Sequence, residues 1–300
     1  MVARFASTIF ALAATLAATA ASAQKSTPDA STPLALPEPI QTKGGLAVLP
    51  DTRLWYWDTG GDGAPIVLVH PATGSALIWG YQAPVFAKAG YRVIGYSRRS
   101  YYNSDPIVAD RPGIASEDLH HLADYLGLKK FHLIGSAAGG GIAADYGVSH
   151  PDRLLSLIVA SNPSGLSSGP IAMLYEDLRP KEFPGLPPDF RELGPSYRAS
   201  NPAGAKLWLE LEHKAITSRP FRQPAANKIT EATLNRLQVP TLLISGEADL
   251  ASPPGLIRKV AAQIPGSELV TVPEGGHSTY WERPDLFNRA VLDFVGRHSK

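Results

Sequence analysis

Residues 131–141, FHLIGSAAGGG, combine the pattern of a buried strand with a turn that could present a reactive side chain. An apolar run with β character ends at Gly135, and small residues that can begin a helix follow with no loop between. Such a turn admits only small residues beside its apex, because the strand and helix backbones nearly touch there. Ser136 carries a hydroxyl that could act as a nucleophile if a base lay within hydrogen-bond reach. A thiol nucleophile is excluded, since the chain has no cysteine.

This stretch resembles the nucleophile elbow of the α/β-hydrolase family, Gly-x-Ser-x-Gly, in which a strained turn exposes a serine at the top of a sheet. Gly135 and Gly139 match the two glycines of that motif. The resemblance therefore places the nucleophile position at Ala137, and the serine of this chain, Ser136, stands one residue early.

The segment after the turn supports this register. Residues 138–150 have the pattern of a helix, and Pro151 ends it fourteen residues after Ala137, the distance that the resemblance implies. A turn with Ser136 at its apex would instead put the bulky Ile134 where the motif has a glycine.

The same resemblance implies an acid and a base. Asp249 follows the predicted strand 241–245 and matches the family's acid, and His277, in the run Pro-Glu-Gly-Gly-His-Ser, matches its histidine. The order nucleophile, Asp, His is that of the family. The chemistry needs a base held in one tautomer by a carboxylate, so that the base can take a hydroxyl proton. Glu247 is the nearest rival for the acid.

Two further segments resemble substrate-facing loops of the family. The run His-Pro-Ala-Thr-Gly at 70–74 is similar to its oxyanion loop, which implies that the amides of Ala72 and Ala138 bind a developing oxyanion. Arg98 and Arg99 stand where relatives carry Asp-x-Arg-Gly. Either arginine could hold a substrate carboxylate or brace neighbouring loops.

Three explanations of Ala137 stay open on the sequence. The alanine replaces a serine of a natural triad, which the retained Asp249 and His277 favour. Alternatively the alanine is natural, and His277 with Asp249 activates water or transfers protons without hydrolysis. In the third explanation the turn is shifted by one residue and Ser136 is the nucleophile.

The elements that must position these residues alternate between strands and helices, which predicts an α/β fold with a mostly parallel sheet covered by helices on both faces. Buried strands are predicted at 66–70, 91–96, 155–160, 241–245 and 268–272, and helices at 77–89, 116–126, 255–264 and 283–297. With the resemblance, they imply an α/β-hydrolase core at 44–161 and 234–300.

Residues 162–233 interrupt the alternation with many prolines and short helical pieces. The resemblance implies that this insertion is a cap over the active site. Its aromatic residues suggest an apolar pocket for a ring or acyl chain, with Trp208 as a candidate substrate contact; they are Tyr175, Phe183, Phe190, Tyr197, Trp208 and Phe221.

The amino-terminal end has the features of an export signal. Arg4 precedes an apolar run at 9–20, and Ala-Ser-Ala at 21–23 matches a small-x-small cleavage site, so residues 1–23 are predicted to be a signal peptide. A Ser/Thr/Pro-rich linker is predicted at 24–43. The expected location is periplasmic or secreted, with no membrane span once the signal is cleaved.

Composition narrows the function further. An apolar content of 44%, a charged content of 18% and a net charge of +1 are those of a globular protein with no basic footprint for nucleic acid. The resemblance implies hydrolysis of a carboxylic ester or related acyl bond of a small, partly apolar substrate, without metal or cofactor; carbon–carbon bond hydrolysis is a close relative. The alternatives are proton transfer by His277 and Asp249, or a catalytically silent protein that binds a small ligand.

Overall fold

A computed structural model describes residues 34–218 and 222–299 of the chain. The predicted signal peptide and residues 24–33 of the predicted linker lie outside the described residues. Within them, no helix is both long and apolar enough to cross a membrane.

The centre of the molecule is a sheet whose strands are ordered β1-β2-β4-β3-β5-β6-β7-β8 in the described part of the chain. From β4 onward in this order all neighbours are parallel, while β1 and β2 pair antiparallel at one edge. The predicted fold class, a mostly parallel α/β sheet, is confirmed. The strands are β1 (Lys43–Val48), β2 (Arg53–Asp58), β3 (Pro65–Val69), β4 (Arg92–Tyr96), β5 (Phe131–Ser136), β6 (Leu154–Ala160), β7 (Thr241–Gly246) and β8 (Glu268–Val272).

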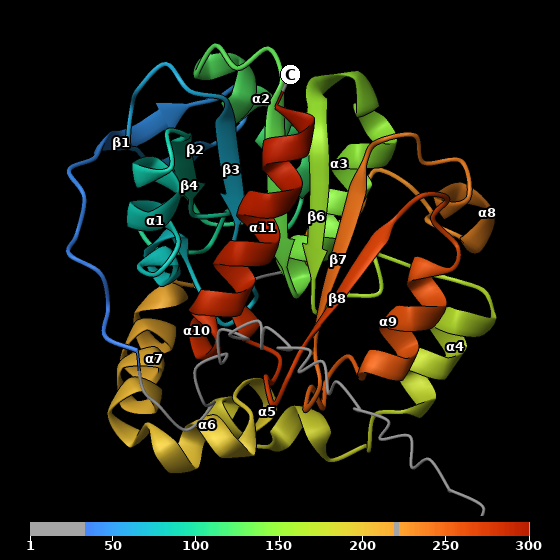
Figure 1. Ribbon diagram of the computed structural model, residues 1–300. Helices are drawn as coiled ribbons and strands as arrows, with labels where there is room; N and C mark the ends of the chain where they lie inside the picture. The colour runs from blue at the N-terminus through green and yellow to red at the C-terminus, as the bar shows by residue number, and fades with distance from the viewer. Residues whose placement is uncertain (1–33, 219–221, 300) are drawn as a thin grey trace, which may run out of the picture.

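Helices cover both faces of the sheet, as Figure 1 shows. One face packs on α2 (Ala115–Tyr125), α3 (Ala138–Ser149) and α9 (Pro254–Ala261), and the other on α1 (Ala83–Lys88) and α11 (Pro284–His298). The central strands are apolar on both sides because each side meets a helical layer. Leu133 of β5 belongs to the first apolar cluster, whereas its neighbour Ile134 belongs to the second.

The predicted helix at 77–89 is two elements, a 3₁₀ turn η1 (Ala76–Trp79) and α1. Pro84 lies in the first turn of α1, where a missing N–H costs nothing, so the chain begins a new helix there. The core also begins slightly earlier than predicted, since β1 starts at Lys43.

The segment 162–233 is helical where it is described. It contains α4 (Pro170–Asp177), a 3₁₀ turn η3 (Phe183–Gly185), α5 (Pro188–Glu192), α6 (Pro195–Ser200), α7 (Pro202–Ala215) and α8 (Glu231–Leu234). The parallel strands run toward α5, α6 and α7 at the bottom of Figure 1, whereas α4 lies beside α9 at the right.

Candidate active site

The turn after β5 has the geometry of a nucleophile elbow. Ala137 has φ 50° and ψ −119°, a conformation that side chains rarely adopt. A Cβ on Gly135 would lie 2.2 Å from the carbonyl oxygen of Gly139, and one on Gly139 would lie 2.1 Å from that of Val69. Both glycines are therefore required by the close approach of β5, α3 and β3, and the apex is Ala137.

The structure contradicts Ser136 as the apex. This residue is the last of β5, pairs with Ala160 of β6 and is fully buried. Its Oγ has no hydrogen-bond partner in the described part of the chain, so no base contacts it. The shifted register is wrong because the turn forms around the one position that takes the positive φ.

Asp249 and His277 form a buried pair at the ends of neighbouring strands. Asp249 follows β7 and His277 follows β8, and Nδ1 of the histidine lies 2.8 Å from Oδ2 and 2.9 Å from Oδ1 of the aspartate. The amides of Ala251 and Ser252 each donate to Oδ1 at 2.8 Å. The carboxylate is thus held in place. It accepts the proton on Nδ1 of His277 and leaves Nε2 facing away from Asp249.

Glu247, the rival for the acid, is exposed and accepts the amide of Glu274 at 3.1 Å. It makes no hydrogen bond to His277, so the acid of this pair is Asp249 alone.

The charge on His277 is set by competing effects. Burial disfavours the imidazolium, but the charges of Asp249 and Glu192 and the Asp249 hydrogen bond outweigh that cost, so the pKa of His277 is raised to about 9. Arg179 acts in the opposite direction. The site therefore stabilises a positively charged histidine, the state that a base reaches after taking a proton.

Ala72 and Ala138 are the residues whose amides are predicted to bind an oxyanion. Ala72 is exposed and Ala138, the first residue of α3, is half-buried, and neither amide donates a hydrogen bond to any residue in the described ranges. The preceding His70 is fully buried; its Nδ1 lies 2.8 Å from the Pro71 oxygen, and its Nε2 accepts the Arg98 amide at 3.0 Å. Burial holds the pKa of His70 well below its usual value, so a neutral imidazole fixes this loop.

The two arginines differ in their surroundings. Arg98 is half-buried, donates to the Pro71 oxygen at 3.1 Å and stacks on the Tyr101 ring, so it stays beside the oxyanion loop. Arg99 is 4% exposed and makes two bonds, at 2.7 and 2.8 Å, to the carboxylate of Asp118. These contacts favour the bracing role for Arg99 over that of a substrate contact, since its guanidinium is paired with Asp118.

Trp208, the predicted candidate for a substrate contact, lies in the core. Its side chain is fully buried in the apolar cluster that contains Trp79 and Tyr280. An aromatic residue on a short helix is as suited to core packing as to a pocket, and here it packs into the core.

Two buried carboxyls near His277 were not predicted from the sequence. Glu282, in α10 (Thr279–Glu282), accepts the amides of Gly194 at 2.7 Å, Gly276 at 3.0 Å and Ser278 at 3.2 Å. The other is Glu192, at the end of α5, which is also buried. Only its position five residues after His277 could have drawn attention to Glu282, and no local signal marks Glu192.

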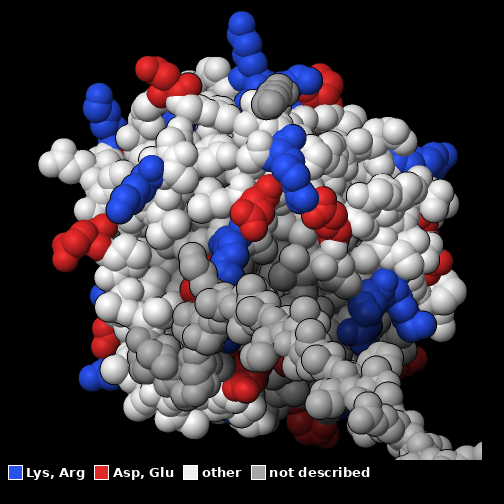
Figure 2. Space-filling model, viewed as in Figure 1, with Lys and Arg blue, Asp and Glu red and all other residues white. Residues whose placement is uncertain are grey.

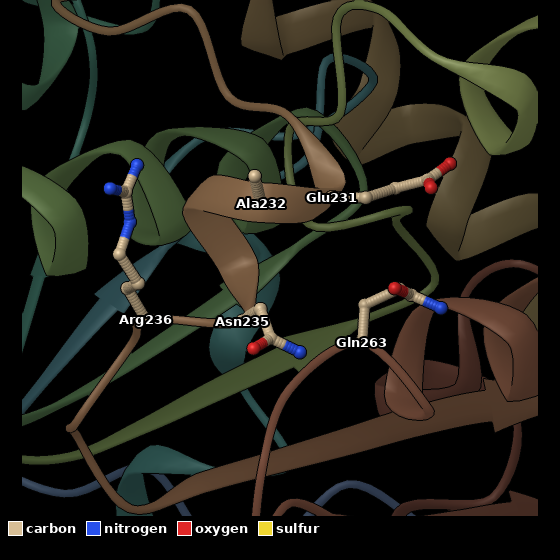
Figure 3. A pocket seen from close by; sticks show the side chains of 5 residues that line it. All are labelled: Glu231, Ala232, Asn235, Arg236 and Gln263. Carbon is tan, nitrogen blue, oxygen red and sulfur yellow. The ribbon is translucent and has the colours of Figure 1, made fainter.

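A surface hollow of about 380 Å³ lies elsewhere (Figure 3). Its lining is polar and comes from α8 and the loop after α9, the segments that precede β7 and β8; the residues are Glu231, Ala232, Asn235, Arg236 and Gln263. The hollow is therefore at the amino-terminal end of these strands, opposite His277. On the face shown in Figure 2, cationic and anionic side chains are interspersed.

Comparison with known proteins defines the class. The model of the alpha/beta hydrolase family matches residues 66–290, and the chain belongs to this family. A 2-hydroxy-6-oxononadienedioate/2-hydroxy-6-oxononatrienedioate hydrolase of Burkholderia vietnamiensis is 27% identical over 269 residues, which cover 82% of this chain and 92% of the relative. The chain is thus an α/β hydrolase, as the elbow motif predicted.

Solved structures agree with the fold. An esterase from Thermogutta terrifontis superposes with a TM-score of 0.67 at 23% identity, covering 87% of this chain and 100% of the esterase. The enol-lactonase from Burkholderia xenovorans LB400 gives a TM-score of 0.65 at 21% identity, covering 84% of this chain and 100% of the lactonase. At these identities the likeness shows the fold.

Proposed function

We propose that the chain has the site of an exported hydrolase for a carboxylic ester or related acyl bond of a small, partly apolar substrate, with Ala137 standing where the nucleophilic serine is expected. The observation that carries the proposal is the pair His277–Asp249, set at the same edge of the sheet as a strained elbow at position 137. The free amides of Ala72 and Ala138 support it, because two such donors stabilise a developing oxyanion by several kcal/mol.

The nucleophile is the missing part. In this reading a serine at position 137 attacks the acyl carbon, His277 takes its proton, and the oxyanion lies against the two amides. With Ala137 the chain has no hydroxyl at the apex, and Ser136 does not replace it because it is fully buried. The chain as it stands is expected to retain the binding site and the base without the acyl-enzyme step.

A fluorophosphonate probe tests this assignment, because it labels only an activated serine. We expect no label on the chain itself and stoichiometric label on Ala137→Ser, lost again when His277→Ala is added. Label on the unsubstituted chain at Ser136 would contradict the proposal.

The proposed export is tested separately. Expression with the full amino-terminal region in a bacterium with a secretion pathway should give a product that begins at Gln24 outside the cytoplasm. A cytoplasmic product that retains Met1 would contradict it.

Ala137 itself favours a second candidate. A His–Asp pair without a nucleophile is still a base, and could move a proton on a carbonyl substrate without hydrolysis. Catalytic exchange of substrate protons by the unsubstituted chain would distinguish this function from a silent ligand-binding role.

A further inference from the structure

The carboxyl of Glu192 is a buried polar group in this site that the nucleophile–His–Asp arrangement does not use. The residue is 8% exposed, and its Oε2 is buried without a hydrogen-bond partner in the described part of the chain. Its neighbours are Thr73 of the 70–74 loop and the charged groups of His277 and Asp249. Thr73 Oγ1 is likewise buried with no hydrogen bond of standard geometry.

The backbone around Glu192 is fastened to the histidine loop. The amide of Ser278 donates to the Glu192 carbonyl oxygen at 2.9 Å. Two residues on, Gly194 donates to Glu282, which also accepts from Gly276 beside the histidine. A Cβ on Gly194 would lie 2.9 Å from the Glu274 oxygen, so the strip packs directly on this loop. The backbone of residues 192–194 is therefore fixed on the loop that carries His277.

The surroundings allow Glu192 to carry a proton. Burial raises its pKa, and the charge of Asp249 raises it further, while His277 and Arg191 lower it. Burial and Arg179 lower the pKa of His277 in turn, but the charges of Asp249 and Glu192 raise it, and the net result is a raised pKa. One proton on such a pair gives either a carboxylic acid beside a neutral imidazole or a carboxylate beside an imidazolium.

We propose that Glu192 is a second proton-transfer residue of this site and acts together with His277 on a carbonyl compound with an acidic α-carbon. This inference rests on the proposed role of His277 as the base, but it needs no hydroxyl at position 137. It gives the chain a reaction that is compatible with Ala137.

The step balances without a further reactant. His277 Nε2 takes a proton from the α-carbon, the C–H electron pair becomes the C=C bond, and the carbonyl π pair moves to oxygen. Glu192 gives its proton to that oxygen and becomes a carboxylate beside the imidazolium. Reversal on the same carbon exchanges its hydrogen with solvent, and return of the proton to another carbon isomerises the compound.

Hydrogen exchange on phenylacetone in D2O, followed by proton NMR near pD 7.5, tests the proposal directly. The unsubstituted chain should exchange the benzylic protons faster than His277→Ala does. Glu192→Gln should lose about 100-fold of that enzymatic rate, as expected for one positioned acid. Glu182→Gln, an exposed carboxyl of the same segment, is the matched control and should leave the rate unchanged.

A second readout is independent of turnover. The pKa of His277, followed by the NMR signal of its ring carbon-bound proton, should fall in Glu192→Gln because one of the two facing carboxyls is gone. A Glu192 whose carboxyl does not face His277 would leave this pKa unchanged. Glu192→Met fills a similar volume without an acid and carries the same two expectations if the Gln variant fails to fold.

Exchange by the unsubstituted chain no faster than by His277→Ala, or an unchanged rate and His277 pKa in Glu192→Gln, would overturn the inference. The outcome is separate from that of the proposed ester hydrolysis. An Ala137→Ser variant that fails to cleave esters would contradict the hydrolase proposal. The exchange rate and the pKa of His277 would still test the role of Glu192.

Discussion

Ala137 retains the strained backbone of a nucleophile position although it has no hydroxyl. A residue held in such a conformation costs on the order of 1–3 kcal/mol and persists only where its surroundings impose it. Here Gly135 packs against the backbone of Gly139, and Gly139 against that of Val69, so the chain has no room to relax. The turn is therefore preorganised for a side chain at position 137, whichever residue stands there.

Ser136, by contrast, contributes a buried hydroxyl with no partner. Ser136→Ala removes an unsatisfied polar atom and leaves the volume almost unchanged. We expect any activity of the chain to stay within about threefold of the parent, and the free energy of unfolding to stay equal or to rise by about 1 kcal/mol. Urea unfolding and a turnover assay on both proteins measure this. Loss of turnover with the fold intact would restore Ser136 as the nucleophile.

At the scale of elements, Glu282 joins the segment 162–233 to the loop that carries His277. Its carboxylate accepts amides from Gly194 on one side and from Gly276 and Ser278 on the other, while burial raises its pKa to about 7. Loop and cap residues near His277 thus share one buried acceptor. A shift of residues 192–194 is therefore expected to move the loop that carries His277.

Glu282→Gln should destabilise the protein, because an amide NH₂ replaces one of the two accepting oxygens. We expect a loss of about 1–3 kcal/mol in the free energy of unfolding at pH 8. A carboxyl whose pKa is raised on folding stabilises fully below its unfolded value, near 4.5, and that contribution disappears as the pH rises through about 7. The gap between parent and variant should therefore be larger at pH 5 than at pH 8, by about 3 kcal/mol at most.

Urea unfolding of both proteins at the two pH values measures this gap. An equal gap at pH 5 and pH 8 would show that Glu282 is ionised throughout. Glu274→Gln, an exposed glutamate of the same loop, is the control.

The sequence predicted those parts of the site that depend on residues close together in the chain. The glycines at 135 and 139 and the proline at 151 determine the elbow and the helix after it, and Asp249 and His277 each follow a recognisable strand. Glu192 could not be found this way, because only the packing of the cap segment brings it to His277. The ion pair of Arg99 with Asp118 and the place of Trp208 in the core could not be predicted either, because both depend on tertiary packing.

At the scale of the whole molecule, the segment 162–233 is more than a cover. Trp208 of α7 lies in the apolar cluster on one face of the sheet, and Ile171 of α4 lies in the cluster on the other. Part of the core would be exposed if the segment were removed. We therefore expect the segment to fold together with the sheet.

Trp208→Ala tests this integration. Truncation of a fully buried tryptophan should lower the free energy of unfolding by about 3–5 kcal/mol, through lost apolar burial and the cavity left behind. Met173→Ala, at an exposed position of the same segment, should change it by less than about 0.5 kcal/mol. Thermal or urea unfolding gives both values. A Trp208→Ala protein as stable as its parent would mean that the segment is a separable lid.

The most direct test of the account is the hydrolysis of a short-chain nitrophenyl ester by the chain and by Ala137→Ser. The substitution adds one oxygen at a strained apex near a base, an orienting acid and two free amides, so the fold should hardly change. Because members of a triad act only together, we expect the rate to rise by several orders of magnitude and the gain to vanish when His277→Ala is added. An Ala137→Ser protein that is folded but no faster than its parent would contradict the assignment of position 137 as the nucleophile position.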